Sequence, residues 1–531
     1  MRPGRMSQAL DAGADLAAKG PRRFWRTAVA VIALAGVALV LHATSKYGAG
    51  ITSLSSAYLD AASSLAKGKG FVFRTGEPMV LWPPLYSMLL ASIQLVTGLE
   101  PAAFAHIVNA VLFAAVIWLS AYLFRPDLTH NAVYGVLGLC TVLFSVPLSL
   151  VYATAWSECL FIPLILLYLI FAQRYWERSE GRSLVFMTFS AALACLTRYI
   201  GLTLVLAGAV TVMIAPRMNL RTRLARAVVS SAVSLAPIAL WILHNCIFTG
   251  TPAGLRQGST SPTTVGMVEA AGVVLSWYAL GLASELVILA WVAVLATRVL
   301  SSGAPASRVL HSFKSIFDTR LPVLLFSVVY TIVLLVTSGA TELDGIDDRL
   351  LSPIYVPATL LLLEFGSLLF GPTKRRSLAL LHRAPSLFLA LWLCFLVADF
   401  ARLTAGRVDN GAGAYSSDTW RKSETMSYVR DKLRTDQEAR WYSNATDALW
   451  ELGRVEASEL PPRARFNLRD LPGRWPPESC AMLVWFNRRS FRGYYTVQEL
   501  ESVADIEEVA RFGDGSVYRA SVRDEKPAAG R

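Results

Sequence analysis

Long apolar segments separated by short polar loops run from residue 24 to residue 402. Most of them approach the length that a helix needs to cross a bilayer, about 20 residues. We place eleven spans at residues 24–43, 102–124, 132–151, 158–173, 183–197, 199–215, 227–243, 282–300, 321–338, 351–370 and 385–402. The pattern predicts an α-helical polytopic membrane protein with about eleven transmembrane helices.

Two further apolar segments are too short or too interrupted to count as spans. Residues 84–99 follow Trp82-Pro83 and close at Gly98, which leaves about 16 residues. We expect this segment to lie at the membrane interface or to dip into it, and residues 265–281 to do the same. Counting either one as a span would reverse the topology of everything after it.

The distribution of lysine and arginine decides between these topologies. The segments predicted to be inside hold 22 Lys and Arg residues, whereas the predicted outer loops hold 7. This asymmetry is the positive-inside pattern, and it supports eleven spans with the N-terminus inside and the C-terminus outside. Residues 1–23 are then a cytoplasmic basic tail. The first apolar run is longer than a signal-peptide core, so we interpret it as an uncleaved span.

The composition changes after residue 402. Residues 403–531 contain no run of membrane length and mix helix with strand signals. Asp418–Arg434 has an amphipathic helical pattern with Ser417 as a cap. Met482–Phe486 and Ser516–Ala520 have strand patterns, the second after the turn residues 513–515. We therefore expect a small extracytoplasmic α/β domain over 403–531, after a transmembrane domain over 24–402.

The overall composition agrees with a membrane protein and argues against nucleic-acid binding. Hydrophobic residues make up 54% of the chain and charged residues 17%, against about 25% charged in soluble proteins. The net charge of +12 comes from residues scattered over loops and tail, without a basic aromatic face. The six cysteines contain no CxxC pair and indicate neither a zinc site nor a disulfide framework.

The residues with chemical potential collect in the predicted outer loops. The first of these, 44–83, is the longest, and its residues 55–65 have a helical pattern that includes Tyr58 and Asp60. A turn at 68–71 ends this helix, and Glu77 and Trp82 follow. This loop is either an interfacial helix with an aromatic anchor or a substrate-facing rim.

Two short loops place single charges at the ends of spans. Ser157 and Glu158 stand at the entrance of a span, where a lipid-facing carboxylate would be costly. One interpretation is structural: Ser157 caps the helix, and the positive end of the helix dipole stabilises the Glu158 carboxylate. The alternative is that the carboxylate is functional. Arg198 and Tyr199 occupy a tight turn that suits a lipid phosphate, although a snorkelling anchor has the same pattern.

The last two loops are more polar. One runs from Trp241 through His244 and Asn245 to Arg256, although a lone histidine is more often structural than catalytic. The other carries Asp347-Asp348-Arg349 at the mouth of a helix. These residues could bind a cation, position a hydroxyl or grip a phosphate, or form an inert solvated loop. The two aspartates point in different directions on a helix. Asp-Asp alone is a weak metal signal, so the metal requirement is left unassigned, with a divalent ion compatible.

In order along the chain, these segments resemble the bacterial polytopic glycosyltransferases of the GT-C fold. Those enzymes are relatives of dolichyl-phosphate-mannose protein mannosyltransferases and of the lipid A aminoarabinose transferase. The matching pieces are Tyr58–Ala62 with Gly68–Phe71, Trp82–Tyr86, Ser157-Glu158, Thr197–Gly201, Trp241–Asn245 and Asp348–Pro353. Each motif is weak alone, and their order and shared predicted face make them specific together.

The resemblance implies an inverting transferase of a bacterial inner membrane. It would move a sugar from a polyprenyl-phosphate-linked donor to an extracytoplasmic lipid, glycan or protein acceptor, without nucleic acid as a partner. The implied catalytic candidates are Asp60, Glu158 and Asp348. The implied substrate-binding candidates are Tyr58, Glu77, Arg198, Tyr199, His244, Asn245, Arg256, Asp347 and Arg349. The three arginines would hold the phosphate or leaving group, and Asp60 is the predicted base.

The chain departs from this family at one position that matters. The family usually has an acidic residue three or four positions before the first-loop tyrosine, where this chain has Leu54 and Ser55. On a helix, positions 55 and 60 point about 140° apart, so Asp60 cannot simply replace a carboxylate at 55. The missing acid keeps open a non-catalytic assembly protein. A transporter or flippase of lipid-linked saccharide is the other alternative, supported only by Glu364 deep in its span.

Overall fold

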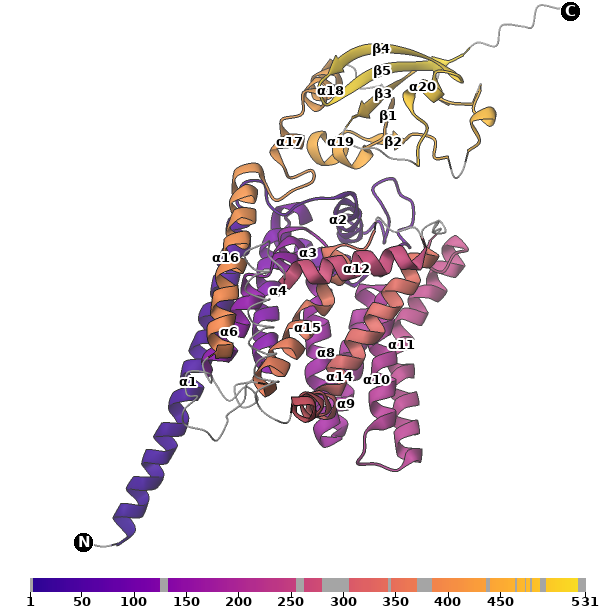
Figure 1. The fold of residues 1–531 in the computed structure, drawn as a ribbon. Helices are drawn as coiled ribbons and strands as arrows, with labels where there is room; N and C mark the ends of the chain where they lie inside the picture. Colours follow the sequence, from indigo (N-terminus) through magenta and orange to yellow (C-terminus); the bar gives the residue numbers. More distant parts are fainter. Residues whose placement is uncertain are drawn as a thin grey trace, which may run out of the picture. The chain divides into compact units, whose positions relative to one another are not determined.

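The computed structural model describes the 531-residue chain with gaps (Figure 1). The described residues are 3–124, 132–254, 262–278, 305–341, 345–369, 384–435, 440–463, 466–472, 474–477, 480–487 and 493–523. The chain divides into two compact units, residues 1–49 with 57–409, and residues 50–56 with 410–531.

The first unit is built from helices alone in the part of it that is described. Figure 1 shows long helices packed side by side, with shorter helices at one end of the bundle. The helices are α1 (Pro3–Ala43), α2 (Ser53–Ala66), α3 (Leu85–Thr97), α4 (Pro101–Leu123), α6 (Ala132–Leu143), α7 (Val146–Ala153), α8 (Glu158–Arg178), α9 (Gly181–Thr197), η1 (Tyr199–Gly201), α10 (Leu202–Ile214), α11 (Leu220–Thr249), α12 (Thr263–Tyr278), α14 (Pro305–Ala340), α15 (Asp348–Leu369) and α16 (Ala384–Asn410).

Seven of the described helices are long and apolar enough to cross a membrane, or eight if the bent pair α6 and α7 is one span. Large apolar side chains lie exposed on them, for example Leu34 on α1 and Leu240 on α11. Such side chains are stable only against lipid or another apolar surface. The chain is therefore a multi-pass membrane protein.

Ten of the eleven predicted spans coincide with described helices. Among them, α9 and α10 have only 17 and 13 residues. The eleventh predicted span, 282–300, lies outside the described residues. The membrane-helix architecture is confirmed, and the count of eleven stays a prediction.

The predicted continuous span at 132–151 is wrong in one respect, because it is bent by 46° between α6 and α7. Pro147 lacks a backbone N–H and cannot continue the α6 hydrogen-bond ladder. Ser145 instead starts a new helix, since its Oγ accepts a hydrogen bond from Leu148 N at 3.3 Å. After the bend, α7 ends at Ala153, and four residues connect it to Glu158, the first residue of α8.

The one deep acid that favoured a transporter is paired in the structure. Arg320 Nε donates to Glu364 Oε2 at 2.6 Å, and both side chains are buried. Arg320 stands at a kink in α14 two residues before Pro322. The pair compensates the charge of Glu364, so this acid gives a transporter less support than it gave in isolation.

Helices α3 and α12 lie where short helices were expected. α3 ends at Gly98, whose φ of 72° is left-handed and favours glycine. α12 lies across the long helices near the end of the bundle where α2 and α3 are drawn (Figure 1). Glu269 of α12 accepts a hydrogen bond from Ile346 N at 2.9 Å, which ties α12 to the turn before α15.

The second unit carries a five-stranded sheet with the order β2-β1-β3-β5-β4. The strands are β1 (Arg440–Ser443), β2 (Ala457–Glu459), β3 (Cys480–Phe486), β4 (Ala504–Phe512) and β5 (Gly515–Val522). β1 is parallel to β2 and β3, and β5 is antiparallel to β3 and β4. The helices are α17 (Asp418–Arg421), α18 (Glu424–Thr435), α19 (Thr446–Gly453), η3 (Leu468–Asp470) and α20 (Val497–Leu500).

The predicted strands at 482–486 and 516–520 lie within β3 and β5. The single predicted helix over Asp418–Arg434 is wrong, because the chain breaks between α17 and α18. Ser417 does not cap it, since its Oγ donates to Ala414 O at 2.7 Å. Ser423 caps α18, since its Oγ accepts from Met426 N at 3.0 Å, and Asp514 from the β4–β5 turn accepts from Thr425 N at 3.3 Å.

Candidate active site

Helix α8 begins with a carboxylate that is withdrawn from solvent. The side chain of Glu158 is only 1% exposed. An unpaired charge in such a place would cost several kcal/mol or more. The burial of Glu158 therefore requires positive partners from other helices.

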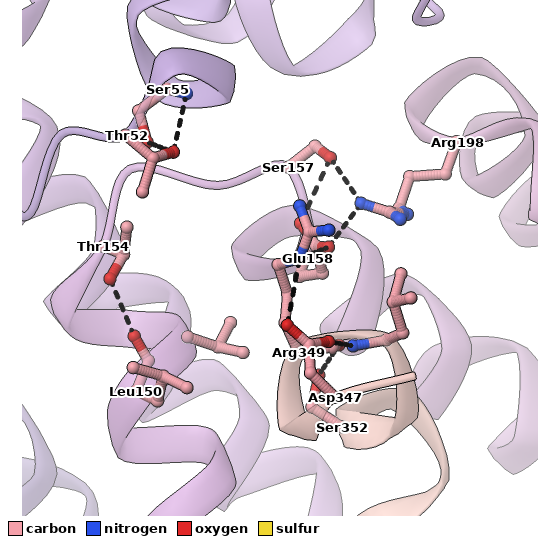
Figure 2. A network of polar contacts seen from close by, with 12 residues as sticks. Thr52, Ser55, Leu150, Thr154, Ser157, Glu158, Arg198, Asp347, Arg349 and Ser352 are labelled. Carbon is pink, nitrogen blue, oxygen red and sulfur yellow. Dashed lines mark hydrogen bonds and ion pairs between the residues drawn. The ribbon is translucent and has the colours of Figure 1, made fainter. Parts of the chain in front are cut away.

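Two arginines supply that charge (Figure 2). Arg198 Nη1 lies 2.5 Å from Glu158 Oε1, and Arg349 Nε lies 3.8 Å from the same oxygen. Arg198 comes from the turn between α9 and η1, and Arg349 is the second residue of α15. The structure thus joins three predicted site residues that are far apart in the sequence.

The turn that holds Arg198 depends on Gly201. A Cβ at this position would lie 2.7 Å from the backbone carbonyl group of Ala194. Backbone atoms cannot move aside as a flexible side chain can, so only glycine fits here without a shift. The close approach keeps η1 against the end of α9 and directs Arg198 toward α8.

Ser157 is the hydrogen-bonding centre of the site. Its Oγ accepts from Arg198 Nη1 at 3.1 Å and lies 2.9 Å from the Tyr58 hydroxyl. It makes no capping hydrogen bond to α8, so the cap prediction for Ser157 is wrong. We call Tyr58, Ser157, Glu158, Arg198 and Arg349 the Glu158 network.

Tyr58 reaches this network from α2, and its side chain is fully buried. Its ring packs against Tyr86, with ring centroids 5.4 Å apart, and Trp82, at 5.7 Å. Burial raises the pKa of the Tyr58 phenol to about 12, against the opposing effect of Arg198. The phenol therefore stays protonated at neutral pH and cannot act there as an anionic base.

The start of α15 positions Arg349. Asp347 Oδ1 accepts from Leu350 N at 2.9 Å, which makes Asp347 the cap of this helix. Asp347 Oδ2 also lies 4.0 Å from Arg349 Nε. The guanidinium of Arg349 stands 5.3 Å from the centre of the Trp156 ring, within the range of a cation–π contact.

Asp348 faces a different part of the structure from Asp347, as expected for neighbours on a helix. Its Oδ1 accepts from Trp277 Nε1 of α12 at 2.7 Å. It also borders a cavity of about 370 Å³. We call this the α15 cavity; it is lined by Val146, Pro147, Ser276, Trp277, Asp348, Tyr355, Leu396, Asp399, Arg402 and Leu403.

The predicted base Asp60 is paired with a cation. Arg74 Nη1 donates to Asp60 Oδ2 at 3.1 Å, and both side chains are largely buried, at 12% and 13% exposure. This ion pair ties α2 to the following loop. Glu77, in the same loop, is exposed.

Tyr199 and Asn245 belong to a second polar cluster. The Tyr199 hydroxyl donates to Val80 O at 3.0 Å and accepts from Trp241 Nε1 at 3.2 Å and from Asn245 Nδ2 at 3.5 Å. These contacts use the donor and both lone pairs of the phenol. The cluster holds the loop before α3 against the end of α11, whereas His244 is exposed and stacks on Trp241.

Three partners in these sites were missed from the sequence: Ser157 as a centre, Arg74 and Trp277. The Ser157-Glu158 pair had a capping pattern that hid the contacts with Tyr58 and Arg198. Trp277 lies 71 positions before its partner Asp348, and only the fold brings them together. The predicted site residue Arg256 lies outside the described residues.

The charges of the network and its neighbour Asp347 balance. Two guanidinium groups, from Arg198 and Arg349, face two carboxylates, from Glu158 and Asp347. Within the described ranges, no group of three His, Cys, Asp or Glu side chains could hold a metal ion. Because both arginines are already held by these carboxylates, an incoming anion would meet guanidinium groups that are in position before it binds.

Two solved structures of one protein, ArnT, share this fold. ArnT from Cupriavidus metallidurans in the apo state is 13% identical over 95% of this chain and 98% of its own, with a TM-score of 0.59. The same protein bound to undecaprenyl phosphate gives 12% identity, coverage of 93% and 98%, and a TM-score of 0.58. The mycobacterial arabinofuranosyltransferase AftD is 14% identical over 95% of this chain and 40% of its own, with a TM-score of 0.46.

No protein-family model matches the sequence, and no curated protein is significantly similar to it. The likeness to ArnT nevertheless extends over almost the whole of both chains. The chain therefore has the same overall fold as ArnT.

Proposed function

We propose that the chain is a membrane glycosyltransferase that takes a sugar from a polyprenyl-phosphate-linked donor. The observation that carries this proposal is the convergence of Arg198 and Arg349 on the buried Glu158. The fold is shared with ArnT, a protein solved with undecaprenyl phosphate bound. A lipid phosphate is the kind of ligand for which two arginines at a helix entrance are suited.

The donor phosphate would bind between the two guanidinium groups. Glu158 holds Arg198 at the entrance of α8, and its negative charge competes with an incoming phosphate for the same guanidinium. Both arginines keep part of their side chain accessible, at 15% and 19% exposure, whereas Glu158 does not. The phosphate would thus meet the arginines from the open side, with Glu158 behind them as their buried counter-ion.

The reaction would be a single displacement with inversion at the anomeric carbon. The acceptor oxygen forms a bond to that carbon while the bond to the phosphate oxygen breaks, and polyprenyl phosphate leaves. The acceptor proton passes to a carboxylate, for which we propose Asp348 because it borders the α15 cavity. Asp60 is the other candidate, although Arg74 already contacts its Oδ2.

The site would lie at the outer face of a bacterial inner membrane. The excess of Lys and Arg in the opposite loops supports an N-terminus in the cytoplasm. The second unit would then be extracytoplasmic, where it could help to select a lipid, glycan or protein acceptor.

The test uses the full chain in nanodiscs with a panel of radiolabelled polyprenyl-phosphate sugars. We expect one donor to release polyprenyl phosphate when an acceptor extract is added. Arg198→Gln and Arg349→Gln should each lower this turnover at least 100-fold, since phosphate contacts stabilise the leaving group. Arg178→Gln is the matched control, because Arg178 ends α8 about 30 Å from Glu158.

Asp348→Asn and Asp60→Asn separate the two candidate bases. We expect Asp348→Asn to abolish transfer and to leave undecaprenyl phosphate binding unchanged. If transfer survives in Asp348→Asn and disappears in Asp60→Asn, the base is Asp60. Absence of turnover with every donor, together with absence of undecaprenyl phosphate binding, would contradict the proposed function.

A further inference from the structure

The α15 cavity is separate from the Glu158 network and has a different character. Helices α7, α12, α15 and α16 bound it, whereas Arg198 and Tyr58 come from η1 and α2. Its volume of about 370 Å³ falls in the range of roughly 300–1,000 Å³ that small-molecule sites enclose. It has room for one compact polar headgroup.

The charges around the cavity disfavour an anionic headgroup. Its lining includes two carboxylates, Asp348 and Asp399, and one guanidinium, Arg402. Arg402 Nη1 already donates to Asp399 Oδ1 at 3.3 Å. That pair is neutral, so Asp348 leaves the cavity with an excess negative charge, and a phosphate would be repelled where a hydroxyl would be accepted.

Asp348 is placed to receive such a hydroxyl. Its Oδ1 accepts the indole N–H of Trp277, and among the described residues this is the one hydrogen bond made to the carboxylate. A carboxylate can accept several hydrogen bonds. The hydrogen bond from Trp277 fixes the orientation of the Asp348 carboxylate. The remaining acceptor positions of this carboxylate suit the hydroxyl groups of a saccharide.

The other walls of the cavity are apolar. Val146, Pro147, Leu396 and Leu403 line it beside the polar groups. A water-borne sugar would gain little from this surface, whereas a hydroxyl-bearing headgroup joined to a hydrocarbon chain would match both parts. The lining is therefore amphipathic in the way that a glycolipid is.

The cavity also adjoins the network through α15. Asp348 and Arg349 are consecutive, so their Cα atoms are about 3.8 Å apart, and their side chains diverge by about 100° around the helix. We propose that the α15 cavity binds the acceptor, and that this acceptor is an uncharged or cationic glycolipid headgroup held through a hydroxyl by Asp348. This inference rests on the proposed transferase function, with donor and acceptor meeting at the N-terminal end of α15.

The test uses two photoreactive probes on the full chain in phosphatidylcholine nanodiscs. Both carry a diazirine in the same octyl chain; one has a β-glucoside headgroup and the other a phosphate. We expect the glucoside to label peptides of α12 and α16 near Ser276 and Leu403 at least fivefold more than the phosphate does. Leu403→Trp, which fills the cavity, should reduce this labelling at least fivefold, and Asp348→Asn about threefold.

Leu391→Trp is the matched control, because Leu391 lies exposed on the same helix and does not line the cavity. It should leave the labelling unchanged. Equal labelling by both probes, or labelling that survives Leu403→Trp, would overturn the inference. Undecaprenyl phosphate binding, measured on the same preparations by native mass spectrometry, separates the two proposals. If that binding persists while glucoside labelling is absent, only the acceptor inference fails; if that binding is itself absent, the donor proposal fails.

Discussion

Replacing Glu158 by glutamine should destabilise the helical unit and, at the same time, strengthen phosphate binding. The substitution keeps the shape of the side chain and removes its charge. Arg198, which is 15% exposed, would then lose its counter-ion 2.5 Å away. A purely structural salt bridge predicts only the first effect, so the combination is informative.

The size of the loss follows from the geometry. At an effective dielectric constant of about 20, the attraction of Glu158 is about 7 kcal/mol to Arg198 and about 4 kcal/mol to Arg349. Desolvation offsets much of this attraction in the intact protein. Removing one partner of a buried pair leaves the other uncompensated and typically costs about 3–5 kcal/mol.

Thermal unfolding of the nanodisc-embedded chain measures this cost. At roughly 1–2 °C per kcal/mol for a unit of this size, Glu158→Gln should lower the apparent Tm by about 3–10 °C. Glu180→Gln is the matched control, since Glu180 pairs with Arg178 on the surface at 3.6 Å. Exposed pairs contribute about 0–1 kcal/mol, so this control should unfold almost like the parent.

Undecaprenyl phosphate should bind the Glu158→Gln variant about tenfold more tightly, because a gain of about 1.4 kcal/mol suffices for that factor. The double variant with Arg198→Gln should be at least 2 kcal/mol more stable than the sum of the single losses predicts. Additive losses, or a Tm equal to that of Glu180→Gln, would refute the ion-pair argument. Weaker phosphate binding in Glu158→Gln would refute the assignment of both arginines to the donor.

Three further changes test other parts of the structure. Gly201→Ala should displace the Arg198 turn by a few tenths of an ångström and lower turnover at least tenfold, whereas Gly272→Ala, where a Cβ meets no atom within 4 Å, should not change it. Tyr199→Phe removes the donor to Val80 O and should cost about 1–3 kcal/mol, seen as faster proteolysis of residues 71–80. Burial raises the pKa of Asp514, but hydrogen bonds from Ser423 and Thr425 outweigh it and hold that pKa below its usual value. The ionised form therefore stabilises α18 above about pH 4. Asp514→Asn should lower the hydrogen-exchange protection of α18 at pH 6, and this difference should fade as the pH falls through the lowered pKa of Asp514.

The sequence predicted the parts of the fold that depend on local pattern. Apolar runs of span length became helices, and strands β3 and β5 lie where alternation and a turn placed them. The bend at Ser145 and the kink at Arg320 were missed, because the hydrophobicity of an apolar segment does not distinguish a straight helix from a bent one. Both are set by a proline two residues later, Pro147 and Pro322, and that signal was available.

The sequence identified most residues of the candidate site but not the contacts between them. Glu158, Arg198 and Arg349 were identified separately, and the structure joins them. For Ser157 a helix cap was one of two open alternatives, because serine before an acidic first turn often caps a helix. The partner that draws it away, Arg198, is 41 residues distant, and no local pattern reports a contact over such a separation.

The structure shows what occupies the position of the missing acid at Leu54-Ser55. Ser55 is fully buried, and its Oγ lies 3.0 Å from Thr52 Oγ1 while its N–H donates to the same oxygen at 3.2 Å. The position is thus closed by a local hydroxyl pair, and a carboxylate there would need compensation that Thr52 cannot give. If the chain transfers sugar, the proton acceptor must then lie elsewhere, and the acids within reach differ in their surroundings. Glu158 faces two arginines and Asp60 faces one, whereas Asp348 faces an indole N–H and a cavity. The contacts therefore favour a base that has moved from α2 to the first turn of α15, and Asp348→Asn is the substitution that decides it.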